Sequence, residues 1–289
     1  MTLYELMLKV NFELIKGRSF TEEEKLKTVK IFLSGISDEK TVKRFHIGVN
    51  APREENGDSR QMYPIFYIPP YKNDADGSLG KKYKTITTVT PLTHILSANA
   101  YELEIIRLLA VFAPQNETVR DMLIKTKERL KTTCFGNFCL TGECFESSII
   151  VLRFLGTAFP GDTQWINKLI QGIKEHLFDK KRHSGTIFYY WLSLSELPFE
   201  IARSEIERFS VKCDPTTEKY SLQSNLCKSY VMNSEHDKYA SPLGKYILRN
   251  CLARLDEYSY LKDRQPYVNE KDGRLYFDIE NSLDIESKG

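Results

Sequence analysis

The sequence predicts a mainly α-helical protein built from stacked helical hairpins, with two small β-hairpin additions. The first observation is a repeat, because residues 105–114 read IIRLLAVFAP and residues 151–160 read VLRFLGTAFP. The two copies begin about 46 residues apart, and such a period is typical of stacked helical hairpins. The second observation is that two kinds of helix alternate, one apolar almost all round and one apolar along a single stripe.

The apolar pattern places the helices of the two copies. Residues 101–113 and 144–159 are apolar almost all round, which indicates helices that are packed on every side. Residues 163–177 carry one apolar stripe at 3.6-residue spacing, so this helix is expected to face solvent on its back.

Prolines and capping residues predict where these helices end and begin. A proline ring prevents a helix from continuing, so the buried helices should end at Pro114 and Pro160. Asn116 and Asp162 follow these prolines, and their side chains can cap the next helix.

The same alternation continues toward both ends of the chain with weaker sequence identity. The further predicted helices are residues 3–15, 21–33, 185–197, 199–209, 221–232 and 242–258. Thr21 and Glu24 have the spacing of a capping box at the start of one of them. About five hairpins are therefore expected.

Two segments have β-like patterns and divide the chain. Residues 62–68 and 82–90 are rich in Tyr, Ile, Thr and Val, and residues 266–279 place two short runs around Asp272 and Gly273. The expected organisation is residues 1–47 as an N-terminal helical hairpin, 48–91 as a β-hairpin insertion, 92–260 as a hairpin-repeat domain and 261–289 as a C-terminal β-hairpin and tail.

Composition excludes several classes of protein. Lys and Arg number 41 against 39 Asp and Glu, so the sequence shows no basic excess of the kind that nucleic-acid binding needs. No apolar run is long enough for a membrane span, and the first residues do not have the pattern of a signal peptide. We therefore expect a cytoplasmic protein without a nucleic-acid partner.

Three cysteines lie at five-residue intervals between the two hairpins. Cys134, Cys139 and Cys144 do not form the paired CxxC pattern of structural zinc sites. The favoured interpretation is small buried residues in a well-packed loop. A redox pair or a metal site is the alternative.

Charged and aromatic residues on the apolar helices have two interpretations each. Arg107 and Arg153 occupy matching places in the repeat, and pairing with Glu104 or Glu146 is favoured over binding of an anionic ligand. The aromatic run at residues 188–191, which includes Tyr189 and Tyr190, suits core packing better than a cavity lining.

The alternation of buried and one-sided helices over residues 92–260 resembles the α/α toroid of terpenoid cyclases, protein prenyltransferase β subunits and six-hairpin glycosidases. The resemblance implies a ring of inner helices around a central cavity, with active residues at the starts of the inner helices. The catalytic candidates that it implies are Glu143, Glu146, His183, His236 and Asp237. The ligand-binding candidates are Cys139, Cys144, Arg153, Tyr189 and Tyr190.

The chain also departs from these families. Cys213, Asp214 and His236 have the residue types of the prenyltransferase zinc site, but their order and spacing differ from it, so no metal site is expected there. An aspartate-rich cyclase motif is missing, and no cofactor motif is recognised.

Two classes of function follow from the sequence. The first is a toroid protein that binds a small, largely apolar isoprenoid-like or glycan-like ligand in a central cavity, with catalysis left open. The alternative is a non-catalytic helical-repeat scaffold that binds a protein partner on its concave face.

Overall fold

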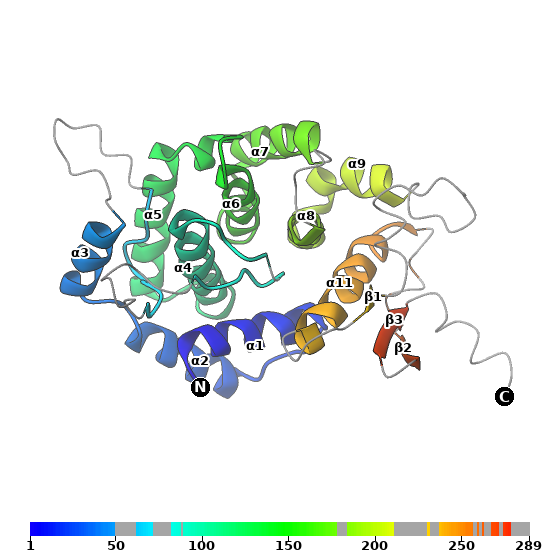
Figure 1. Cartoon of the computed structure of the whole chain (residues 1–289), viewed down its shortest axis with the longest axis horizontal. Helices are drawn as coiled ribbons and strands as arrows, with labels where there is room; N and C mark the ends of the chain where they lie inside the picture. The colour runs from blue at the N-terminus through cyan, green and yellow to red at the C-terminus, as the bar shows by residue number, and fades with distance from the viewer. Residues whose placement is uncertain are drawn as a thin grey trace, which may run out of the picture. The chain divides into compact units, whose positions relative to one another are not determined.

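The computed structural model describes a mainly helical chain (Figure 1). The described residues are 1–49, 62–71, 82–87, 89–177, 184–210, 230–231, 237–256, 259, 262, 267–271 and 274–278. They form two compact units, the first made of residues 1–11 and 19–186 and the second of residues 12–18 and 187–289. This division falls inside the predicted repeat segment 92–260.

The helices of the first unit are α1 (Leu3–Ile15, shared with the second unit), α2 (Glu22–Ser34), α3 (Glu39–Gly48), α4 (His94–Phe112), α5 (Glu117–Thr132), the 3-10 helix η1 (Phe135–Asn137), α6 (Cys144–Ala158) and α7 (Thr163–His176). The second unit holds most of α8 (Ser184–Glu196), then α9 (Phe199–Ser210), α11 (Asp237–Leu252) and the strands β1 (Tyr230–Val231), β2 (Tyr267–Lys271) and β3 (Arg274–Asp278).

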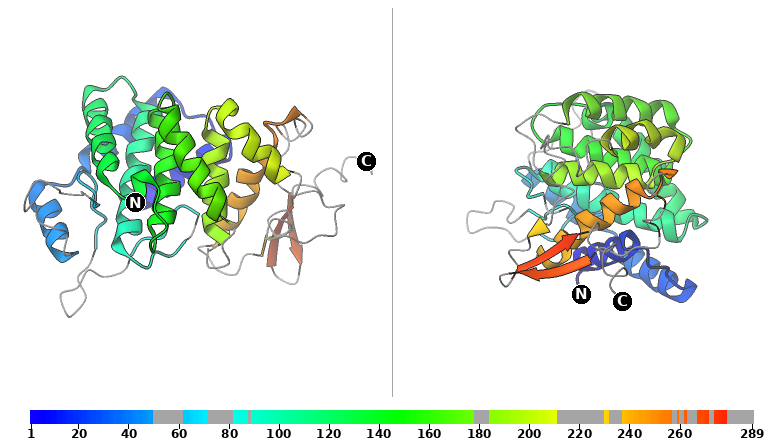
Figure 2. Two further views of the ribbon diagram at one scale, coloured as in Figure 1. Left: turned by 90° about the horizontal axis from the view of Figure 1, so that it is seen from above. Right: turned by 90° about the vertical axis from the view of Figure 1, so that its right-hand side faces the viewer.

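The two predicted hairpin copies are α4–α5 and α6–α7, and they stack through their first helices. Helices α4 and α6 share the most extensive contact between helices, and they lie side by side in Figures 1 and 2. Both are buried along most of their length, whereas α5 and α7 bury only one face. The predicted alternation of buried and one-sided helices is therefore confirmed in this unit.

A buried ion-pair cluster joins the two copies. Arg153 on α6 donates from Nη1 to both carboxylate oxygens of Glu104 on α4, at 2.8 and 2.7 Å. Arg107, one turn along α4, donates to the same carboxylate at 3.2 Å and also to Asn11 of α1. The pairing of the repeated arginines with Glu104 is as predicted, and it offsets the cost of burying these charges.

Some of the described helix starts have the side-chain cap that the sequence predicts and others do not. Thr21 and Glu24 form the predicted capping box at α2, and Asn116 accepts from the Val119 amide at α5. Asp162 precedes α7 but makes no side-chain cap; its carboxylate pairs with Lys127 Nζ of α5 at 2.5 Å. The predicted cap is therefore wrong at Asp162, which links two helices instead.

The predicted β-hairpin insertion has no strand in its described residues, 62–71, 82–87 and 89–91. The backbone amides of Ile65, Phe66 and Tyr67 donate to one carboxylate oxygen of Glu102, at 2.9, 2.6 and 3.0 Å. Glu102 lies on α4, and its other oxygen accepts from Arg129 at 2.9 Å. The backbone donors that a β ladder would use are thus satisfied by a buried side chain.

The second unit differs from the prediction at residues 230–231 and at the start of its last helix. Residues 230–231, predicted as helical, form strand β1, which pairs with β3 in a sheet of order β1-β3-β2. Helix α11 begins at Asp237, so Pro242 lies beyond its first turn rather than near its start. In the C-terminal segment, β2 and β3 pair antiparallel with Lys271 opposite Arg274.

Among the helices described, none combines the length and the apolar character that crossing a bilayer requires.

Candidate metal centre

Three cysteine side chains converge where the first hairpin passes into the second. Cys134 precedes η1, Cys139 lies in the following loop, and Cys144 is the first residue of α6. Their sulfur atoms all lie within 4.8 Å of one another, and the sulfurs of Cys134 and Cys144 are 3.4 Å apart. All three are thiols that form no disulfide. The sequence spacing of five residues gives no periodic signal for this convergence.

Hydrogen bonds fix the turn that carries Cys134. Thr133 Oγ1 donates to the Leu130 carbonyl at 2.8 Å and accepts from the Gly136 amide at 2.9 Å. Trp165 Nε1 of α7 donates to the Gly136 carbonyl at 2.5 Å. A Cβ at residue 136 would lie 2.0 Å from the Leu130 carbonyl oxygen, so only glycine fits there.

Phe138 holds the loop immediately before Cys139. Its φ of 64° is in the left-handed region, which is costly for a residue with a side chain. The ring stacks on His176 at 5.9 Å and packs edge-on against Phe145 at 6.2 Å. Gly172 of α7 leaves room for the Phe138 ring, because a Cβ on residue 172 would lie 2.5 Å from ring atoms. Packing of the aromatic ring therefore stabilises a strained backbone.

The end of the loop is tied to both buried helices. Ser148 Oγ donates to the Cys144 carbonyl at 2.8 Å and to the Phe135 carbonyl at 2.7 Å. Glu143 accepts from the Leu92 and Thr93 amides, the latter at 2.7 Å, at the start of α4. The backbone around the three thiols is thus held from both sides, and this reduces the cost of gathering them around a ligand.

The thiols differ in acidity. Partial burial acts to raise the pKa of Cys139, but the hydrogen bonds from Thr141 and from the Cys144 and Cys134 thiols outweigh it, so the pKa of Cys139 is lowered. Burial, followed by the interaction with Cys134, raises the pKa of Cys144. Cys139 is therefore expected to lose its proton before Cys144.

The sulfur spacing can be compared with that of a zinc site. A zinc ion bonds thiolate sulfur at about 2.3 Å, which places the sulfurs of a tetrahedral site about 3.8 Å apart. The sulfurs of Cys134 and Cys144 are 3.4 Å apart, and the other two sulfur separations are no more than 4.8 Å. Within the described part of the chain, no fourth Cys, His, Asp or Glu ligand joins the three.

The other predicted site residues of the first unit lie apart from this chemistry. Glu143 caps the start of α4, as described above. Arg153 is buried against Glu104, and Glu146 is buried on α6. Among the predicted ligand-binding residues, Cys139 and Cys144 are the two that lie in the cysteine cluster.

The predicted aromatic residues lie in the core of the second unit. Tyr189 and Tyr190 are buried on α8, and Tyr190 donates to Glu205 of α9 at 3.2 Å. Burial, together with the Glu205 charge, raises the pKa of Tyr190. Core packing, the favoured interpretation of this aromatic run, agrees with these positions.

Four predicted residues, His183, Cys213, Asp214 and His236, lie outside the described residues. Asp237 is described only as the first residue of α11. The sequence analysis missed Phe138 as the residue that shapes the loop and Gly172 as the position that admits its ring. Both depend on contacts across the hairpin, and the one sequence signal for them is a glycine inside a helix, at position 172 of α7.

Comparisons of the chain with protein-family models, with curated proteins and with solved structures gave no match.

Proposed function

We propose that this helical-hairpin protein binds one zinc ion through Cys134, Cys139 and Cys144. The observation that carries the proposal is the convergence of three reduced thiols within 4.8 Å, in a turn whose backbone is otherwise fixed. Thiolates select zinc and other thiophilic ions over hard cations. The lowered pKa of Cys139 favours its thiolate, which is the form that binds metal, whereas Cys144, whose pKa is raised, would have to release its proton to the metal ion.

The zinc ion in this proposal keeps one coordination position for water or an external ligand. Sites with three protein ligands and an exchangeable fourth position are typical of catalytic zinc, whereas structural zinc usually has four protein ligands. A zinc ion with such an open position would act as a Lewis acid and would lower the pKa of the water bound there. The proposal therefore includes ligand binding at the metal.

Zinc titration against a competing chelator tests the proposal. The chain, stripped of metal under reducing conditions, is expected to bind one zinc ion, and Cys139→Ser should weaken binding at least about 10-fold. Cys251→Ser is the matched control, because Cys251 is buried in the second unit and donates to the Trp191 carbonyl. Zinc affinity should also fall as the pH is lowered, because protons compete for the thiolates.

Two results would contradict the zinc site. One is an absence of stoichiometric zinc in the reduced chain. The other is equal zinc affinity in the original chain and in a variant with serine at all three cysteine positions. Formation of a Cys134–Cys144 disulfide in place of metal binding would favour the redox interpretation of the same cluster.

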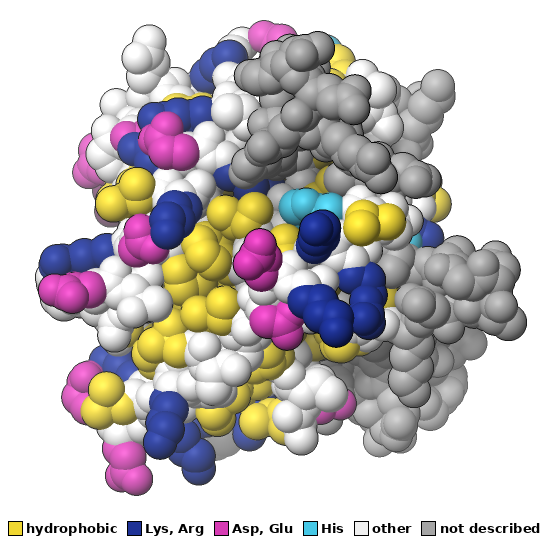
Figure 3. Space-filling model, turned by 90° about the vertical axis from the view of Figure 1, so that its left-hand side faces the viewer, with side chains coloured by type: hydrophobic (Ala, Val, Ile, Leu, Met, Phe, Trp, Pro, Cys, Tyr) yellow, Lys and Arg dark blue, Asp and Glu magenta, His cyan; other side chains and the backbone are white. Residues whose placement is uncertain are grey.

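A protein-binding scaffold is a second candidate function. The stacking of α4–α5 on α6–α7 is the arrangement on which repeat scaffolds are built. Figure 3 shows hydrophobic side chains gathered on one face, among charged ones, and Leu26, Leu92 and Ile124 are large apolar residues that are exposed. Affinity capture of a stoichiometric partner, lost with Ile124→Ser but retained with Thr132→Ser on the same helix, tests this candidate. Binding of an isoprenoid-like or glycan-like ligand in a central cavity stays a prediction.

A further inference from the structure

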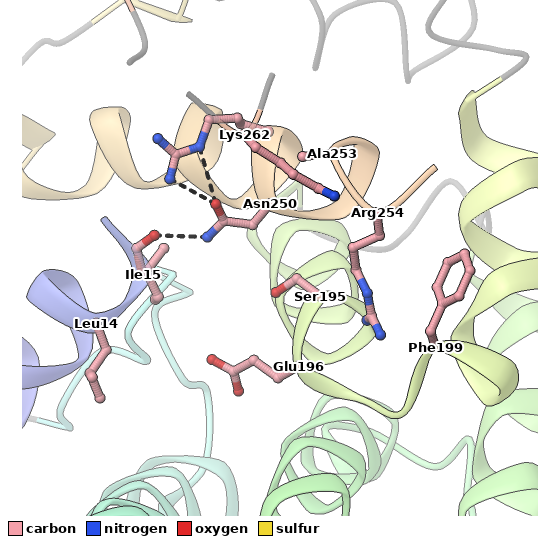
Figure 4. Close-up of a pocket in the computed structure, with 10 residues that line it drawn as sticks. Leu14, Ile15, Ser195, Glu196, Phe199, Asn250, Ala253, Arg254 and Lys262 are labelled. Carbon is pink, nitrogen blue, oxygen red and sulfur yellow. Dashed lines mark hydrogen bonds between the residues drawn. The ribbon is translucent and has the colours of Figure 1, made fainter. Parts of the chain in front are cut away.

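The second unit contains a pocket of about 530 Å³ (Figure 4). It is lined by Leu14, Ile15, Ser195, Glu196, Phe199, Arg249, Asn250, Ala253, Arg254 and Lys262. These residues come from the end of α1, the α8–α9 turn, and α11 with the residues that follow it. All of them belong to the second unit, whereas the three clustered cysteines belong to the first.

Positive charge dominates the polar lining. The charged residues of the lining are three cations and one carboxylate, namely Arg249, Arg254, Lys262 and Glu196. A concave site lined by charges of one sign concentrates ions of the opposite sign. In Figure 4, Lys262 and Arg254 lie on one side of the pocket and Glu196 on the other.

The Arg254 guanidinium is held in place by its neighbours. Nη1 donates to the Leu194 carbonyl at 2.5 Å and Nη2 donates to the Leu197 carbonyl at 2.7 Å. These carbonyls lie at the C-terminal end of α8, where a cation is favourable. The guanidinium also lies over the Phe199 ring at 5.2 Å. The charge is therefore fixed at the pocket wall before any ligand arrives.

Arg249 is fixed through Asn250. Its Nε and Nη2 donate to Asn250 Oδ1 at 3.1 and 2.8 Å, and its guanidinium lies over the Tyr246 ring at 5.0 Å. Asn250 Nδ2 donates in turn to the Ile15 carbonyl at 2.7 Å. Arg249 is buried and Arg254 is half-buried, and this burial lowers the pKa of both.

Such pre-organised guanidinium groups are suited to ligands that carry anionic oxygen groups. Arg matches the planar or tetrahedral oxygen groups of carboxylates and phosphates, and fixing the side chain beforehand reduces the entropy that binding costs. Lys262 is exposed, so it can move to contact a bound anion as a flexible point charge. Glu196 supplies an acceptor that favours a ligand carrying an amine or hydroxyl group as well.

We propose that this pocket binds a small phosphate-bearing molecule, with its phosphate against Arg254 and Lys262 and an amine or hydroxyl group toward Glu196. The inference is independent of the zinc site, because the residues concerned belong to the other unit. A phosphate monoester with a short amine-bearing chain is within the size of the pocket.

Phosphorus-detected NMR titrations of the full chain, at constant ionic strength, test the proposal. The two probes are inorganic phosphate and phosphoethanolamine, and both should bind saturably, with phosphoethanolamine the tighter. Lys262→Gln should weaken both about 3-fold to 10-fold. Lys30→Gln is the matched control, because Lys30 is an exposed lysine of the first unit, and it should leave both affinities unchanged.

Glu196→Gln separates the two ends of the pocket. It should remove the advantage of phosphoethanolamine over inorganic phosphate while leaving phosphate binding intact or strengthening it. The proposal is overturned by non-saturable signals at tens of millimolar probe, or by equal weakening in Lys262→Gln and Lys30→Gln. It is also overturned if phosphoethanolamine keeps its advantage in Glu196→Gln.

Discussion

Glu104 is the residue on which the two hairpin copies depend most directly. Its carboxylate is 2% exposed and accepts from Arg107 on its own helix, α4, and from Arg153 on α6. One buried carboxylate therefore pairs with two buried guanidinium groups, and both lose this partner if the Glu104 carboxylate is removed. Removing one partner from a buried pair leaves an uncompensated charge in the interior.

Glu104→Gln should lower the free energy of unfolding by about 3–5 kcal/mol, because two guanidinium groups lose their anion. Urea denaturation followed by circular dichroism measures the change. Glu128→Gln is the control, because Glu128 pairs with Lys131 at the surface and should cost less than about 1 kcal/mol. Equal losses in the two variants would show that the buried cluster does not hold α4 to α6.

Cysteine reactivity is the second property argued at the scale of single residues. A lowered pKa gives Cys139 more thiolate at a given pH, whereas the raised pKa of Cys144 and its burial protect that thiol. In the metal-free chain at pH 7–8, iodoacetamide should therefore modify Cys139 well before Cys144. Peptide mapping by mass spectrometry gives the order, and earlier modification of Cys144 would contradict the assignment.

At the scale of the element, helix α7 shapes the cysteine loop from outside it. Gly172 admits the Phe138 ring, and the ring holds the backbone before Cys139 at positive φ. Alanine at position 172 would gain about 1 kcal/mol of helix propensity. The added Cβ would however overlap the ring, and overpacking costs about 1–3 kcal/mol.

Gly172→Ala should therefore destabilise the chain slightly and weaken zinc binding, since the ring can move only by shifting the loop. Zinc affinity and thermal unfolding are measured together. Gly161→Ala serves as the control, because no atom lies within 4 Å of a Cβ at residue 161. A more stable Gly172→Ala variant with unchanged zinc affinity would contradict the role given to Phe138.

The elements differ in how far local sequence determined them. Helices α5 and α7 each bury the face that carries their apolar stripe, and α2 begins with its capping box. At α7 the stripe determined the helix although the expected Asp162 cap does not form. The strands predicted at residues 62–68 and 82–90 do not form in the described residues. The amides of residues 65–67 donate to the Glu102 carboxylate instead, and the amides of Tyr83 and Val89 donate to the hydroxyls of Ser97 and Thr85. Helix α3 was missed, although Asp38 accepts from the Thr41 amide as a cap.

The candidate site was predictable only in part. Cys139 and Cys144 were singled out from their place before a buried helix, and the metal interpretation was the less favoured one. The convergence with Cys134 depends on the turn at Gly136 and on the positive φ of Phe138. Neither feature can be predicted from the spacing of apolar and polar residues. The pocket in the second unit was missed because its residues are far apart in the sequence.

At the scale of the whole molecule, metal binding and folding are linked. A ligand that binds only the folded chain stabilises it by mass action, by about 2.7 kcal/mol at a free concentration 100 times the Kd. Zinc should therefore raise the unfolding temperature of the reduced chain, and EDTA should reverse the effect. Calorimetry measures the shift, and Cys139→Ser should show a smaller one. An equal rise in the unfolding temperature of Cys139→Ser would mean that zinc binds at another site.

X-ray absorption at the zinc edge tests the central claim most directly, because it counts the ligands of the bound ion and gives their distances. We expect three sulfur atoms at about 2.3 Å and one lighter ligand at about 2.0 Å. Loss of one sulfur in Cys139→Ser would identify the site. A first shell of nitrogen and oxygen alone would contradict the three-cysteine metal centre.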